Sequence, residues 1–234
     1  MPRKRALMMV KLDPPAEREA EWNDWYAGHV AARLALPGWL SGRRFVRMDG
    51  IPRETAVAGE AKYLALYDLA GVDVLKSEAY DRLREQEATR GQDSFDVQVF
   101  KLPKFARGIY EQIYPEEGDY RPPPSRFVSV MGHEVPRNRQ REFAAWYDTE
   151  HIPSLMVRPG YLTCRRFKLS RDISPIVSNG GTLPTYLTVY DIESERVFER
   201  GASQPAAPTP WTQWVRSWYT RKMSMVARRI YPKD

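Results

Sequence analysis

Residues 21–29 read EWNDWYAGH, and residues 142–151 read the similar EFAAWYDTEH. Each stretch is followed by the same two motifs in the same order, namely Pro-Gly-aromatic (37–39 and 159–161) and Arg-Arg-Phe (43–45 and 165–167). Unrelated segments rarely share Trp-Tyr, His, Pro-Gly-aromatic and Arg-Arg-Phe in one order. The pattern therefore predicts that the chain contains a tandem repeat, and that the fold follows from it.

The two copies differ in length by one residue inside this stretch. Trp25 and Trp146 lie 121 residues apart, whereas His29 and His151 lie 122 residues apart, so the first copy lacks one residue. Later matches are YLALYD with YLTVYD (63–68 and 186–191) and Ile-Tyr-Pro with itself (113–115 and 230–232). The predicted domains are a first repeat at 5–115, a proline-rich linker at 116–125 and a second repeat at 126–232.

Hydrophobic periodicity predicts the same order of elements in both halves. The predicted strands are 6–12, 39–48, 62–68, 105–114, 127–134, 161–169, 184–191 and 223–231. The predicted helices are 16–36, 71–83, 137–157 and a segment that starts after the N-cap Thr209. Residues 85–96 are polar and show no clear pattern.

Each half thus reads strand-helix-strand-strand-helix-strand, which is the ferredoxin-like order. Such a unit leaves one face of its sheet bare, and two bare faces can cover each other. The predicted class is α+β, with two ferredoxin-like repeats packed sheet to sheet as a barrel within one chain and the helices outside.

Composition narrows the possible partners and location. The net charge of +6 is scattered among acidic residues, so we expect no nucleic-acid partner. No apolar run is long enough to cross a bilayer and the basic start is not followed by a signal sequence, so we expect a cytoplasmic protein without a membrane partner. The single cysteine, Cys164, excludes an internal disulfide and is interpreted as a small apolar strand residue.

The repeated motifs carry a resemblance to a known family. The pattern Trp-Tyr, His, Pro-Gly and Arg-Phe, at 25–45 and again at 146–167, resembles the EthD-like branch of the dimeric α/β-barrel superfamily. This superfamily includes cofactor-free monooxygenases, polyketide cyclases, muconolactone isomerases and haem-dependent peroxidases. The resemblance implies a pocket for a small, mostly aromatic molecule between each sheet and its helices. Because two copies are fused here, the two pockets need not be equivalent.

The chain has three histidines, and two of them occupy the same place in the repeat. His29 and His151 follow the Trp-Tyr pair on the helix face that is predicted to point inward. His133 stands at the end of a strand where the first half has Leu12. If that strand face lies under the helix, His133, His151 and Tyr147 converge, and the second half is the predicted working site. The alternative is that each histidine is a buried structural residue.

Arginines and aromatic residues complete the predicted site. Neighbouring strand residues point to opposite faces, so one arginine of each Arg-Arg pair, 43–44 and 165–166, can face a cavity and bind a carboxylate or phenolate. Solvated or ion-paired arginines, and a core-facing aromatic stripe, are the alternatives. The predicted substrate-binding residues are Arg166, Arg165, Arg44, Tyr26, Trp146 and Trp218.

These residues predict a cofactor-independent enzyme that acts on a small aromatic or lactone-like acid. His151 with His133, and by repetition His29, would shuttle a proton, and Tyr147 would orient the substrate or hold an enolate. Isomerase, lyase or cyclase chemistry fits, as does a monooxygenase whose substrate itself activates oxygen. The alternative is a non-catalytic ligand-binding or accessory protein of an aromatic catabolic or polyketide pathway. No metal site is predicted, although haem or a metal ion stays open, and the molecule would be a monomeric pseudo-dimer or a homodimer.

Overall fold

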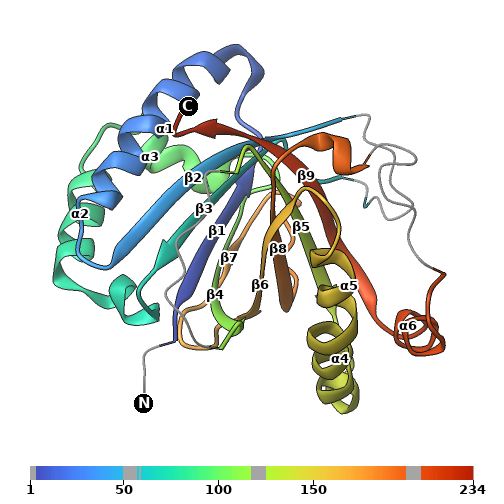
Figure 1. The fold of residues 1–234 in the computed structure, drawn as a ribbon. Coiled ribbons are helices and arrows are strands. Elements are labelled where there is room, and N and C mark those ends of the chain that lie inside the picture. Colours follow the sequence, from blue (N-terminus) through green and yellow to red (C-terminus); the bar gives the residue numbers. More distant parts are fainter. Residues whose placement is uncertain (1–3, 50–56, 58, 117–124, 199–206, 234) are drawn as a thin grey trace.

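The chain forms a closed antiparallel barrel, shown in Figure 1 for a computed structural model that describes residues 4–49, 57, 59–116, 125–198 and 207–233. Eight strands follow one another as β1-β3-β2-β9-β5-β8-β6-β4, and pairing of β4 with β1 closes the ring. These strands are β1 (Ala6–Leu12), β2 (Trp39–Arg47), β3 (Tyr63–Leu69), β4 (Ala106–Tyr114), β5 (Phe127–Glu134), β6 (Tyr161–Leu169), β8 (Tyr186–Ile192) and β9 (Thr220–Tyr231). The short strand β7 (Ile176–Val177) pairs with Ala106 and Arg107 at the start of β4.

The first half of the chain supplies β4-β1-β3-β2, and the second half supplies β9-β5-β8-β6. The halves are joined where β2 pairs with β9 and where β4 pairs with β6. Because side chains alternate along a strand, Leu7 and Met9 point into the barrel, while Met8 and Val10 point outward. The interior is filled by apolar side chains from both halves, so the barrel is a packed core and not a channel.

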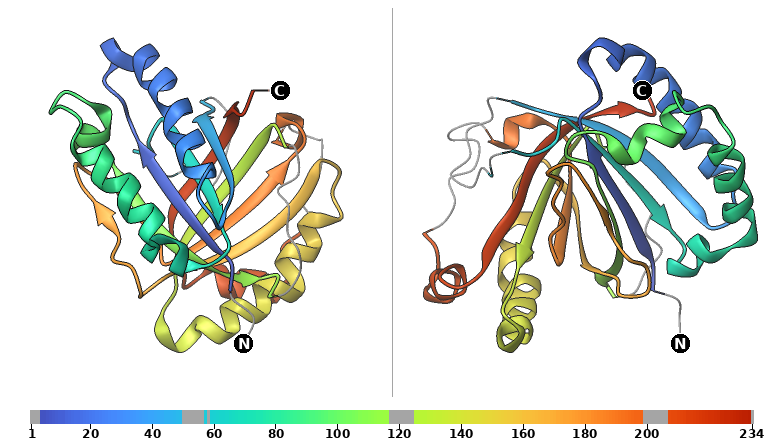
Figure 2. Two further views of the ribbon diagram at one scale, coloured as in Figure 1. Left: turned by 90° about the vertical axis from the view of Figure 1, so that its left-hand side faces the viewer. Right: turned by 180° about the vertical axis from the view of Figure 1, so that it is seen from behind.

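Helices cover the outside of the barrel in two groups, which Figures 1 and 2 show on opposite sides. The first group is α1 (Glu19–Leu34), α2 (Glu78–Ala88) and α3 (Phe95–Gln98); the second is α4 (Gln140–Trp146), α5 (Ile152–Met156) and α6 (Pro210–Arg216). The hydroxyl of Thr209 accepts a hydrogen bond from the Thr212 amide, which confirms the predicted N-cap of α6. Each group encloses an outer core against its own half of the sheet.

The one-residue difference between the repeated stretches is absorbed by a π-helical turn. In the first half, α1 is a continuous α-helix through His29, whereas Tyr147–His151 form a π-turn between α4 and α5. A π-turn accommodates one extra residue without moving the flanking turns. As a result His151 still contacts Trp146, at a ring distance of 4.7 Å, much as His29 contacts Trp25 at 4.5 Å.

Two buried ion pairs connect the halves inside the barrel wall. Arg43 of β2 binds Asp191 of β8, and Arg165 of β6 binds Asp68 of β3. The two pairs are reciprocal, since each half supplies one arginine to the aspartate of the other. All four side chains are almost fully buried, so losing one partner would leave an uncompensated charge in the core.

The predicted α+β class and the barrel are confirmed, and β1, β5 and β6 have the predicted bounds. Four elements were not predicted: α3, β7 and the 3-10 turns Val99–Lys101 and Glu195–Phe198. The proline-rich part of the predicted linker, 117–124, lies outside the described residues. Within the described chain, every helix is too short or too polar to cross a bilayer.

Candidate functional site

Each half contains a pocket of about 270 Å³ between its helices and the barrel. The first pocket is lined by Met8, Val10, Tyr26, His29, Arg33, Tyr67, Tyr80, Arg84, Glu87, Ala88, Asp96, Val97, Val99, Phe100, Phe105 and Arg107. The second pocket is lined by Ser129, Met131, His133, Trp146, Tyr147, His151, Leu155, Tyr161, Tyr190, Phe198, Arg216, Tyr219 and Arg221. His29 and His151 therefore occupy corresponding walls.

In the first pocket, His29 stands beside two carboxylates. Its Nδ1 atom lies 3.4 Å from Oε1 of Glu87 and 3.7 Å from Oδ1 of Asp96. Glu87 comes from the end of α2 and Asp96 from α3, so three helices meet at this imidazole. Arg33, one turn after His29 on α1, binds Glu87 with both terminal nitrogens and also lies 3.0 Å from Nδ1.

These carboxylates are ionised, since their surroundings favour the charged form. Burial alone would raise the pKa of Glu87, but hydrogen bonds with His29 and Arg33 hold that pKa at about 2. Burial likewise opposes ionisation of Asp96, yet the neighbouring His29 and hydrogen bonds from Arg90, Trp25 and Ser94 keep its pKa well below the usual range. The histidine thus faces two ionised carboxylates, each of which is also paired with an arginine.

The contacts of Nδ1 fit two tautomers of His29, because Arg33 can only donate to this nitrogen, whereas the carboxylates of Glu87 and Asp96 can only accept from it. Oδ2 of Asp96 accepts from Trp25, Arg90 and Ser94, whereas its buried Oδ1 has no hydrogen-bond partner. A hydrogen on Nδ1 of His29 would point toward this oxygen and toward Glu87. That tautomer leaves a lone pair on Nε2, which has no partner among the described residues. His29 is then arranged to accept a proton from a bound molecule.

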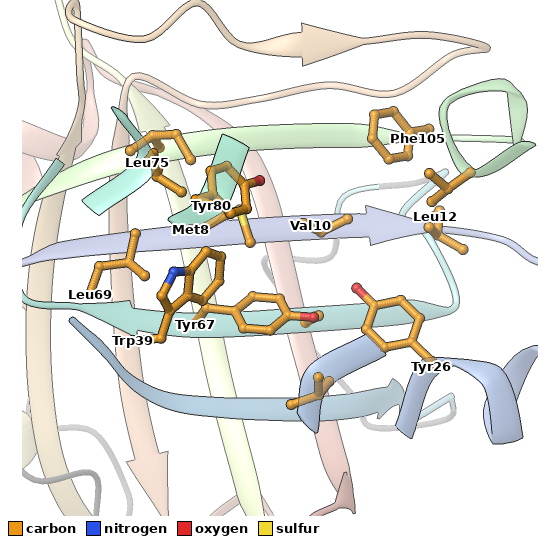
Figure 3. Packing of buried hydrophobic residues seen from close by; sticks show 14 of the residues in the cluster. Met8, Val10, Leu12, Tyr26, Trp39, Tyr67, Leu69, Leu75, Tyr80 and Phe105 are labelled. Atoms are coloured by element: carbon orange, nitrogen blue, oxygen red, sulfur yellow. The ribbon is translucent and has the colours of Figure 1, made fainter. Parts of the chain in front are cut away.

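Two tyrosines and an arginine complete the first pocket. Figure 3 shows the hydroxyls of Tyr26 and Tyr67 pointing toward one another beside Met8 and Val10. Burial raises the pKa of Tyr67 well above its usual range, so its phenol stays protonated and can donate a hydrogen bond. Arg107 contacts Met8 and Tyr80 and has no carboxylate within ion-pair distance among the described residues.

In the second pocket, the structure brings together the predicted residues His133, His151 and Tyr147. The Tyr147 ring lies 5.9 Å from His133 and 4.7 Å from His151. Trp146 stacks on His151, and Tyr219 contacts the other face of the site at 4.9 Å from His133. The predicted convergence of these side chains under the helix is therefore observed.

The histidines of the second pocket are uncharged at neutral pH. Burial, followed by the positive charge of Arg221, lowers the pKa of His133 to about 3. Burial and then the nearby Arg216 and Arg158 lower the pKa of His151 to about 3. Among the described lining residues none is acidic, and Glu150 instead binds Thr209, Thr212 and Trp146. These imidazoles are therefore weak bases.

The other predicted binding residues do not line the second pocket. Arg165 lies in the barrel with Asp68, and Arg166 binds Asp148 while covering the Tyr147 ring. Arg44 takes the corresponding place in the first half, over Tyr26 and bonded to Asn23. Trp218 packs on the outer core of the second half. Of the predicted set, Tyr26 and Trp146 line a pocket.

Sequence reasoning missed Glu87, Asp96, Tyr67 and Arg107. The two carboxylates lie in the polar stretch 85–96, which has no apolar periodicity that could reveal its helices. His29, Glu87 and Asp96 form the one metal-like group in the described part of the chain, with ligand atoms within 4.8 Å of one another. Because Arg33 and Arg90 already pair with these carboxylates, the group fits a metal ion poorly.

Comparisons with solved structures identify the fold. An anthrone oxidase-like protein superposes with a TM-score of 0.64 at 12% identity, covering 98% of this chain and 92% of that one. A candidate monooxygenase from Fusobacterium nucleatum gives 0.53 at 9% identity, with coverages of 98% and 94%. A candidate chlorite dismutase gives 0.53 at 11% identity, with coverages of 97% and 95%.

The likeness to these structures shows that this chain has the same fold. No protein-family model matches the sequence, and no curated protein matches it.

Proposed function

We propose that the protein is an enzyme that removes a proton from a small aromatic substrate in the first pocket, without a cofactor, and lets the resulting anion react with oxygen. The observation that carries this proposal is the placement of His29 between two ionised carboxylates and an aromatic cavity. Proton transfer is assigned to His29 and not to His151 or His133, because two carboxylates lie beside His29, whereas the described lining residues of the second pocket include none.

The residues of the first pocket have different roles in the proposed reaction. Nε2 of His29 accepts the proton, while Glu87 and Asp96 offset the positive charge that develops on the imidazole. The Tyr67 hydroxyl donates to the oxygen on which negative charge gathers. Arg107 lies on the same cavity wall and adds a positive charge without a competing carboxylate. The substrate class is therefore an aromatic ketone or phenol with an acidic hydrogen.

The names of the structural neighbours support a reaction of the substrate anion with oxygen. One neighbour is described as anthrone oxidase-like and another as a candidate monooxygenase. Anthrone has a carbonyl group and an acidic CH₂ group, so it matches the chemistry proposed for this pocket. Deprotonation gives an electron-rich anion, which takes up one O₂; loss of one water then leaves anthraquinone.

The finer family assignment belongs to the same proposal. We infer that the chain is a tandem duplication of a ferredoxin-like unit from the EthD-like branch. The repeated motifs, the matching strand orders of the two halves and the reciprocal ion pairs support this inference. A role in the metabolism of aromatic compounds follows from the proposed substrate class.

The test is oxidation of anthrone in air, followed by oxygen uptake and by the absorbance of anthraquinone. We expect one O₂ consumed per quinone formed, and a loss of about 10²- to 10⁴-fold in kcat for His29→Asn. The Leu34→Ala variant, an exposed position on the same helix, serves as the matched control.

Two results would count against the proposal. Turnover that survives in His29→Asn would remove this imidazole from the reaction. Binding of anthrone without any turnover by the wild-type chain would favour the alternative, a non-catalytic ligand-binding protein.

A further inference from the structure

The second pocket has an excess of positive charge. Arg221 is partly buried on its wall, and Arg216 stands at its exposed rim. Neither arginine has a carboxylate partner among the described residues, and Arg221 donates only to the Tyr219 hydroxyl, at 3.2 Å. The Nε atom of Arg221 is enclosed and has no hydrogen-bond partner. A guanidinium that is half removed from water without a counter-charge is costly, and an anion would offset that cost.

His133 adds a directed hydrogen-bond donor to this wall. The side chain is 3% exposed, and its Nδ1 atom is enclosed without a partner. Burying an unpaired N–H group is less favourable than burying an unpaired lone pair, so the neutral ring is expected to carry its hydrogen on Nε2. Nε2 is the nitrogen left to face the cavity, where it can donate to an acceptor such as a carboxylate oxygen.

The remaining walls are flat and largely aromatic. Trp146, Tyr147, Tyr161, Tyr190, Phe198 and Tyr219 surround the cavity, with Leu155 and Met131 between them. Aromatic rings pack well on planar molecules, in stacked or edge-on arrangements. The volume of about 270 Å³ matches a small ring compound and not an extended chain.

We propose that the second pocket binds a small aromatic carboxylate, whose charge is held by Arg221 and His133 and whose ring packs among Trp146, Tyr147 and Tyr219. This site is separate from the proton-transfer site proposed for the first pocket. The two pockets would then have diverged into a reactive site and an anion-binding site.

A bound carboxylate would supply the negative charge that the surroundings of the two histidines lack. The charged and titratable groups around them are Arg158, Arg166, Arg216, Arg221, Asp148, Glu150, Tyr147, Tyr161, Tyr190, Tyr219 and Cys164. Asp148 is paired with Arg166, and Glu150 is engaged by two threonines and a tryptophan. The carboxylate of the ligand would therefore be the nearest unpaired negative charge.

The test is isothermal titration calorimetry with benzoate and with benzamide, which has nearly the same shape and no charge. We expect benzoate to bind at least about tenfold more tightly at pH 7, as a charge-assisted hydrogen bond predicts. Equal affinities for the two probes, or no heat from benzoate at 10 mM, would overturn the proposal.

Variants of the two pocket arginines test which pocket binds the benzoate anion. Arg221→Gln should weaken benzoate about 10- to 100-fold, and Arg221→Lys should retain part of the affinity because it keeps the charge. Arg107→Gln, in the first pocket, is the matched control and should leave benzoate binding unchanged. Loss of binding in Arg107→Gln with full binding in Arg221→Gln would place the anion in the other pocket and contradict the proposal.

Nuclear magnetic resonance of the unmodified chain keeps the test independent of any folding defect in the variants. With three histidines in the sequence, the imidazole ¹⁵N signals are simple to assign with His29→Asn and His133→Asn samples. Benzoate should shift the His133 signals, because Nε2 gains an acceptor, and leave those of His29 in place. The reverse pattern would overturn the assignment.

Discussion

The two pockets of this molecule are built from the same parts and differ in the charged groups around their histidines. Both have a volume of about 270 Å³, and in both a histidine packs against a Trp-Tyr pair on a helix. The first places Glu87 and Asp96 beside its imidazole, whereas the second surrounds its imidazoles with arginines. The difference teaches that an aromatic signature fixes where a histidine lies, while neighbouring charges decide what it can do.

The largest effect on kcat in this comparison is expected for Tyr67, measured against Tyr190, the corresponding tyrosine of the second pocket. Tyr67→Phe removes the donor proposed for the developing oxyanion, so kcat for anthrone oxidation should fall about 10²- to 10³-fold. Tyr190→Phe is the matched control: its hydroxyl bonds Tyr147 in the second pocket, and turnover should stay within about threefold of wild type. Equal losses in the two variants would erase the functional difference between the pockets.

A smaller effect is expected from the carboxylate that positions His29. Asp96→Asn removes one negative charge beside the imidazole, so kcat should fall about 10- to 100-fold, as for other outer partners of functional histidines. Asp148→Asn, which changes the aspartate bound to Arg166, should leave kcat within about threefold of wild type.

The smallest expected difference between the pockets is in the pH dependence of the free energy of unfolding. The folded pKa of His133 and of His151 lies near 3, below the ordinary value of 6.5. The unfolded chain therefore binds more protons between these values. Their contribution to stability is complete above pH 6.5 and is lost as the pH falls toward 3. Each histidine should add a slope of about 1.4 kcal/mol per pH unit within that window.

The variant His133→Asn should remove one such slope, measured by urea unfolding at pH 4 to 7. Glu87 of the first pocket, whose pKa falls from 4.5 to about 2, loses its contribution only below pH 4.5. Glu87→Gln should therefore leave the curve above pH 5 parallel to wild type. A His133→Asn curve parallel to wild type across pH 4 to 7 would show that this histidine is not held neutral in the fold.

The sequence predicted more of the scaffold than of the site. Alternating and continuous apolar runs located all eight barrel strands, and the Trp-Tyr-His motif located His29, His151 and their aromatic neighbours. The one-residue offset between the copies also corresponds to a physical feature, the π-turn at Tyr147–His151. Local patterns sufficed here because each of these features depends on residues close together in the chain.

The partners of the charged residues could not be predicted in the same way. Asp68 and Arg165 lie 97 residues apart, and Arg43 and Asp191 lie 148 apart, so their pairing depends on how the halves align. His29 meets Glu87 and Asp96 only because α2 and α3 fold back over α1. The polar stretch that contains these carboxylates has no apolar period, and its function became visible only through three-dimensional contacts.

The most direct test of whether proton abstraction takes place in the first pocket is hydrogen–deuterium exchange at the acidic CH₂ group of anthrone, followed in D₂O without oxygen. This measurement isolates proton abstraction from every later step. We expect His29→Asn to lose the exchange that the protein catalyses and His151→Asn to keep it. The opposite result, with exchange lost in His151→Asn and kept in His29→Asn, would contradict the assignment of proton transfer to the first pocket.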